Sequence, residues 1–167
     1  MTILEKRDRP IKICVLNQEP RIADRHLASI ESELSKICDF DLIKITSIDD
    51  DEFFPCDLLI IIAHTLESDD LITWVKGLAG RMEKSGKILT PALIVGEDID
   101  LAARGLMKFA AAENWYFDLV DVEHVNSIAI RAANLIRIHD HIHELGRYEN
   151  SITKLENQVK DLLEKLP

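Results

Sequence analysis

The stretch Leu58-Leu59-Ile60-Ile61-Ile62-Ala63 decides the fold, because an unbroken apolar run of this kind is typical of a β-strand that is covered on both faces. Residues 11–16 (IKICVL) and 92–95 form similar runs, whereas the less apolar residues 42–45 are typical of a strand at the edge of a sheet. The aromatic segment around Trp115-Tyr116-Phe117 predicts a further strand. The sequence therefore predicts several short strands that are spread along the first two thirds of the chain.

Helical patterns fill the links between these strands. Apolar residues recur at helical spacing from Ala23 to Ile37, and Ser68 is a suitable N-cap for a helix that runs to about Lys84. A further helix is predicted from about Asp98 to Ala112. This alternation with short links predicts an α/β domain with an open parallel sheet, helices on both faces and right-handed crossovers. In such sheets functional sites gather at the carboxyl ends of the strands.

The last third of the chain follows a seven-residue apolar repeat that is typical of a coiled coil, in a helix that begins near Glu123. β-branched residues at one position of the repeat and leucines at the other favour two parallel helices. Ile142 and Leu163 widen the apolar stripe, so a higher oligomer or packing against another domain remains an alternative. We expect a homodimer with an interface formed by Ile138, Leu145, Tyr148, Ile152, Leu155, Val159, Leu162 and Leu166.

The length of 167 residues is sufficient for one domain with its own core and a modest appendage. We divide the chain into an N-terminal extension (residues 1–10), the α/β domain (residues 11–137) and the coiled-coil helix (residues 138–167).

The formal net charge of −10 at pH 7 argues against nucleic acid and anionic membranes as partners, because both carry negative charge. No apolar stretch is long enough to cross a membrane, and no apolar segment follows the charged N-terminus. Cys14, Cys38 and Cys56 lack the spacing of metal ligands, so we expect them to be reduced and structural. These features predict a cytoplasmic protein.

Two histidines near the start of the repeat suggest an alternative function, as a metal site or a phosphotransfer site. His139 and His143 lie four residues apart on one helix face, which is the spacing of two metal ligands, but a third ligand is not evident. His143 also begins a His-Glu-Leu sequence that resembles the phosphotransfer helix of histidine kinases, without the residues that usually follow it. No P-loop or G-x-G-x-x-G pattern follows the first strand. We therefore expect neither a metal nor a cofactor, and a protein that is not an enzyme.

Several segments resemble the strands of response-regulator receiver (CheY-like) domains. Residues 12–20 (KICVLNQEP) are similar to the family pattern K-I-L-V-V-D-D-E-P, and residues 56–62 (CDLLIII) to P-D-L-I-L-L-D. Residues 90–97 (TPALIVGE) resemble T-P-I-I-M-L-T-A, and residues 112–119 (AENWYFDL) resemble A-D-D-Y-L-T-K-P. The resemblance covers residues 11–137 and implies the receiver fold, a flavodoxin-like parallel sheet of five strands.

The same resemblance implies a degenerate phosphorylation site. Asn17 and Gln18 stand where the family has metal-binding acidic residues, Ile62 replaces the phosphoacceptor aspartate, Gly96 replaces a switch hydroxyl, and Asp118 replaces a lysine. Aspartyl phosphorylation needs a carboxylate nucleophile, a divalent cation held by carboxylates and a cation that balances the phosphoryl charge. Because Ile62 cannot attack phosphorus and Asp118 would repel the phosphoryl group, we expect no phosphorylation and no catalytic residue.

The resemblance therefore implies a pseudo-receiver that works without phosphorylation. We expect a protein–protein interaction module of bacterial signalling that recognises a signalling protein and dimerises through its C-terminal coiled coil. The alternative is the N-terminal regulatory domain of a larger signalling enzyme, such as a diguanylate cyclase, a phosphatase or a histidine kinase, with the coiled coil as its linker.

Overall fold

The computed structural model describes residues 9–17, 20–37, 39–45, 56–63, 73, 75–80, 90–96, 108 and 115–164. The elements with defined bounds are β1 (Ile11–Asn17), α1 (Pro20–Leu34), β2 (Phe40–Ile45), β3 (Leu58–Ala63), β4 (Ala92–Gly96), β5 (Phe117–Asp121), the 3-10 helix η2 (Val122–Ser127) and α4 (Ile128–Glu164).

All described strands join one parallel sheet in the order β2-β1-β3-β4-β5. This order is that of the flavodoxin-like doubly wound fold, so the predicted fold class is confirmed. The apolar run of β3 lies in the middle of the sheet, and the less apolar β2 lies at an edge, as its sequence predicts.

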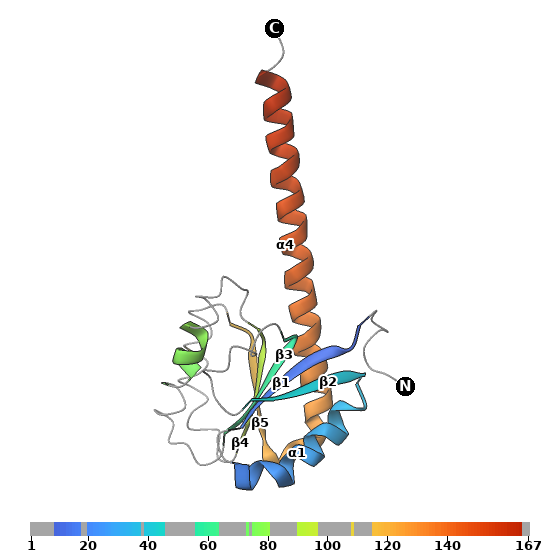
Figure 1. Ribbon diagram of the computed structural model, residues 1–167, viewed down its shortest axis with the longest axis vertical. Helices are drawn as coiled ribbons and strands as arrows, with labels where there is room; N and C mark the ends of the chain where they lie inside the picture. Colours follow the sequence, from blue (N-terminus) through green and yellow to red (C-terminus); the bar gives the residue numbers. More distant parts are fainter. Residues whose placement is uncertain are drawn as a thin grey trace.

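Both faces of the sheet are buried, which explains why β3 is apolar throughout. Leu58, Ile60 and Ile62 pack with α1 and α4 on one face, whereas Leu59 and Ile61 face the helical residues 75–80 on the other. Figure 1 shows α1 and α4 together on one side of the sheet and the short helical segment on the opposite side. The sheet is therefore the central layer of a three-layer domain.

β5 begins later than the aromatic residues suggest. Trp115 precedes the strand and is buried, and its Nε1 donates a hydrogen bond to the backbone oxygen of Thr90 at 2.7 Å. Tyr116 is exposed, and pairing with β4 starts at Phe117. The prediction of a strand around Trp115 is therefore wrong by about two residues, because the ring of Trp115 fills the core at the entry to the strand.

α4 is a single helix of 37 residues, which corresponds to a length of about 55 Å. Asp121 caps the preceding η2 by accepting a hydrogen bond from the backbone N–H of Glu123 at 2.8 Å. Residues of α4 from Ile128 to His139 contribute to the core, and none of the described residues after His139 is buried. We call residues 140–164 the stem, which extends well beyond the domain in Figure 1.

Two predicted helices fall largely outside the described residues. Of the helix predicted over residues 68–84, the structure describes residue 73 and residues 75–80, all of them helical. Of the helix predicted over residues 98–112, it describes Lys108, which is helical. A membrane-spanning helix is not found among the described residues, as none of their helices combines the required length and hydropathy.

Candidate functional site

The carboxyl edge of the sheet brings together three of the positions that the sequence singles out. Asn17 ends β1 and lies in register with Ile62 of β3, and Gly96 ends β4 next to Ala63. Gln18 follows this edge but lies outside the described residues. The sheet register therefore brings Asn17, Ile62 and Gly96 to the same edge of the sheet.

This edge lacks an attacking group on β3. Ile62 is 3% exposed, and the strand from Leu58 to Ala63 contains only aliphatic side chains. Gly96 is buried and has no side chain that could carry a hydroxyl. Among the described residues, β3 and β4 thus offer no side chain for covalent catalysis at this edge.

The expected position of Asp118 at the carboxyl edge is wrong. The sheet register places Asp118 opposite Leu93, three positions before the pair Gly96 and Asp121. Its carboxylate instead accepts hydrogen bonds from Nη1 of Arg131 on α4, at 2.8 Å and 2.7 Å. The error follows from the late start of β5, and Asp118 serves to connect β5 to α4.

Among the described residues, Asp121 is an acidic residue that does lie at the carboxyl edge, and it was missed from the sequence. It stands opposite Gly96 in the register. One of its carboxylate oxygens accepts the backbone N–H of Glu123 and so caps η2. The signal that could have revealed it is an aspartate directly before a helical segment, which is a preferred N-cap.

The amino edge of the sheet holds a buried carboxylate, Asp57, which is 5% exposed. Its two oxygens accept hydrogen bonds from the guanidinium of Arg9 at 2.9 Å and 2.7 Å, and one also accepts the backbone N–H of Lys12 at 2.9 Å. These hydrogen bonds raise the pKa of Arg9, and the negative charge of Asp140 on α4 adds to this effect. The group has the geometry of a structural anchor, in which Arg9 ties the N-terminal extension to the domain.

Cys14 and Cys56 are buried together on the face of the sheet opposite α4 and are not joined by a disulfide. Hydrogen bonding to Cys14 and burial raise the pKa of the Cys56 thiol strongly. A neutral buried thiol is a poor nucleophile, so Cys56 is structural, as expected for a reduced core cysteine. The third cysteine, Cys38, lies outside the described residues.

The stem carries an exposed apolar stripe that matches the predicted coiled-coil positions. We call this stripe the seam, and its side chains are between 55% and 68% exposed; it consists of Leu145, Tyr148, Ile152, Leu155, Val159 and Leu162. Of the other predicted interface residues, Ile138 is half-buried and Leu166 lies outside the described residues. An isolated protomer therefore exposes most of the interface that the sequence predicts.

The histidines at the base of the stem are not part of a cluster of metal-binding side chains among the described residues. The rings of His139 and His143 meet edge to face with centroids 4.4 Å apart, and His139 is buried. His141 lies 3.8 Å from a carboxylate oxygen of Glu144. In the part of the chain that the structure describes, no group of three or more metal-binding side chains is found.

Comparisons with known proteins concern the fold alone. No family model matches the chain, and no curated protein matches it. Similar solved structures include rubredoxin oxygen:oxidoreductase from Desulfovibrio gigas, with 10% identity, a TM-score of 0.47 and coverage of 78% of this chain. The chain spans 37% of the length of that oxidoreductase.

Two flavodoxins are also similar. The flavodoxin of Fusobacterium nucleatum bound to flavin mononucleotide is 13% identical, with a TM-score of 0.44 over 80% of this chain and 98% of its own. A cysteine-to-serine mutant of Pseudomonas aeruginosa flavodoxin is 10% identical, with a TM-score of 0.41 over 78% of this chain and 97% of its own. The fold class rests on the strand order of the chain itself.

Proposed function

We propose that the chain is a phosphorylation-independent protein–protein interaction module, a pseudo-receiver that dimerises through its stem and presents its α/β domain to a signalling partner. The observation that carries this proposal is the seam, a row of large apolar side chains that a monomer leaves in water. Burying such side chains is favourable by about 1.5–3 kcal/mol each, and a second stem supplies a matching surface.

The carboxyl edge supports the part of the proposal that excludes phosphorylation. Ile62 occupies the expected phosphoacceptor position, and its register with Asn17 supports the alignment on which that assignment rests. An aliphatic side chain has no oxygen that could form an acyl phosphate. In this proposal the domain is recognised through its surface and does not switch by phosphoryl transfer.

Sedimentation equilibrium of the full chain tests the dimer. The double variant Leu155→Asp with Leu162→Asp places four carboxylates in the interface of a dimer, so we expect a monomer where the wild type is a dimer. The matched control is Asn150→Asp with Asn157→Asp, which adds the same charges to the opposite, exposed side of the stem. A monomeric wild type at tens of micromolar, or equal dimers in both variants, would contradict the proposal.

The continuity of α4 supports a second candidate function. A single helix connects the core of the domain to the end of the described stem without a break, which is how a regulatory domain would transmit movement to a following enzyme domain. Under this alternative the chain is the regulatory part of a diguanylate cyclase, a phosphatase or a histidine kinase. The gene sequence that follows the codon of Pro167 tests it, since it either encodes such a domain or does not.

A further inference from the structure

We infer that the partner at this surface is a second copy of the chain that lies parallel and in register along the whole outer face of α4, from Ile130 to Leu162, and not along the stem alone. This inference rests on the proposed dimer and adds its register, its extent and a contact between the parts of α4 that pack on the two domains. Its consequence is that the two domains flank a common helix pair.

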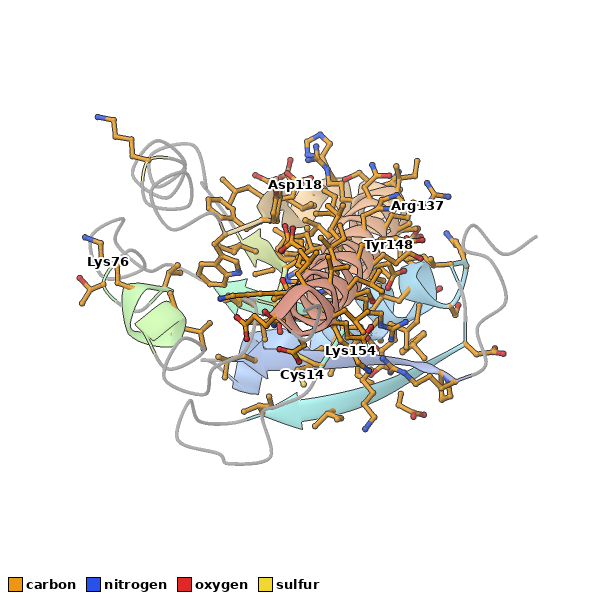
Figure 2. All side chains as sticks on the ribbon, turned by 90° about the horizontal axis from the view of Figure 1, so that it is seen from above. Cys14, Lys76, Asp118, Arg137, Tyr148 and Lys154 are labelled. Atoms are coloured by element: carbon orange, nitrogen blue, oxygen red, sulfur yellow. The ribbon has the colours of Figure 1, made fainter. Side chains whose placement is uncertain are left out.

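The two sides of α4 are the first support. The residues of α4 that are buried against the sheet and the residues of the seam lie on nearly opposite sides of the helix, roughly 160° apart at about 100° per residue. In Figure 2, which views the molecule along α4, Arg137 and Tyr148 lie on the same side of the helix, whereas Lys154 lies on a different side. A second helix that covers the seam therefore approaches α4 from the side that its own domain leaves open.

Ile130 is the second support. It belongs to the part of α4 that packs on the sheet, residues 128–139, yet its side chain is 61% exposed. It falls on the same side of the helix as the seam. Asn134, Arg137 and His141 are exposed on this side between Ile130 and Leu145. The open face is therefore continuous with the seam, and no described element of the protomer covers it.

The parallel orientation of the two helices follows from the need to cover the exposed side chain of Ile130. In a parallel, in-register dimer each residue lies beside its own copy, so Ile130 meets the corresponding turn of the partner. An antiparallel pairing of the two stems would place the domains at opposite ends and would leave Ile130 in water. The β-branched residues Ile152 and Val159, with leucines at the other seam position, favour the parallel arrangement independently.

The length of the seam is the third support. The described seam contains three complete apolar pairs, which is near the lower limit for a coiled coil. A short coiled coil gains stability when its helices also pack beyond the repeat. Contact between the two copies of α4 along residues 128–139 would supply this packing.

Disulfide cross-linking of the full chain tests the register. In a Cys38→Ser background, whose described cysteines are buried, Asn134→Cys and Leu162→Cys each place a thiol beside its own copy in the inferred dimer. We expect both to form a covalent dimer under mild oxidation. The controls Ser29→Cys on exposed α1 and Asn157→Cys on the outer side of the stem should not.

Ile130→Arg tests the domain-level contact by a second route. We expect its dimer dissociation constant to rise about tenfold, because both copies lose an apolar contact and gain a charge. Lys154→Glu, at an exposed position that faces away from the seam, should leave the constant unchanged. A stable wild-type dimer with no cross-link at residue 134 and no effect of Ile130→Arg overturns this inference and leaves the proposed dimer intact, whereas a wild-type monomer overturns both.

Discussion

At the scale of single residues, two aspartates with arginine partners differ sharply in burial. Asp57 is almost fully buried and also accepts the backbone N–H of Lys12, whereas Asp118 and Arg131 are both more than a third exposed. We expect Asp57→Ala to lower the free energy of unfolding by about 1–3 kcal/mol, since it leaves the part-buried N–H of Lys12 without this acceptor. Asp118→Ala should cost less than about 1 kcal/mol. Urea denaturation measures both, and equal losses would contradict the anchor role of Asp57.

The raised pKa of Cys56 leads to a prediction about stability at alkaline pH. Its pKa is raised in the folded chain above the ordinary value of 9.0, chiefly by the hydrogen bond to Cys14 and by burial. The unfolded chain therefore loses a proton above that pH while the folded chain keeps it, so the stability contributed by the neutral thiol declines as pH rises. We expect the free energy of unfolding to fall by up to about 1.4 kcal/mol more per pH unit in the wild type than in Cys56→Ala. Parallel stability curves for the two proteins above that pH would refute this assignment.

At the scale of elements, the strands with apolar runs could be predicted to within about two residues, because burial on both faces leaves a direct signature in the sequence. β5 could not, since the buried ring of Trp115 carries the same aromatic signal as a strand residue. Asp118 was misplaced as a consequence. The ion pair of Arg9 with Asp57 was missed because it joins residues 48 positions apart, and no local pattern reports such a contact.

The charges that flank the seam give a prediction for α4 as an element. In a parallel, in-register coiled coil, Glu144 of one helix lies beside Glu149 of the other, so two like-charged pairs oppose the dimer. Glu149→Lys converts both pairs to attraction, and we expect dimerisation to tighten by about fivefold at low salt. Glu156→Lys makes the same charge change, but in the parallel dimer it lies beside the uncharged Ser151 of the other helix, so it should have little effect on dimerisation. Equal tightening by the two variants indicates antiparallel helices, in which Glu149 lies near Glu156.

At the scale of the whole molecule, α4 separates the carboxyl edge from the stem. The helix follows η2 at the carboxyl edge and passes the amino edge, where Asp140 influences Arg9. A ligand bound at Asn17 and Ile62 would therefore have to act on the stem through the length of the domain. In a phosphorylatable receiver the aspartyl phosphate supplies such a signal, because its charge must be accommodated by the surrounding residues.

The last prediction concerns this route. Beryllofluoride with Mg²⁺ mimics an aspartyl phosphate only where a carboxylate can bind it, and Ile62 has no oxygen. We expect neither the dimer dissociation constant nor the hydrogen exchange of α4 to change when beryllofluoride and Mg²⁺ are added to the full chain. A phosphorylatable receiver domain in the same buffer serves as the positive control. Because α4 and the sheet connect the carboxyl edge to the stem, a clear shift in either measurement would show that this edge still holds a phosphoryl-like group and would refute a function that is independent of phosphorylation.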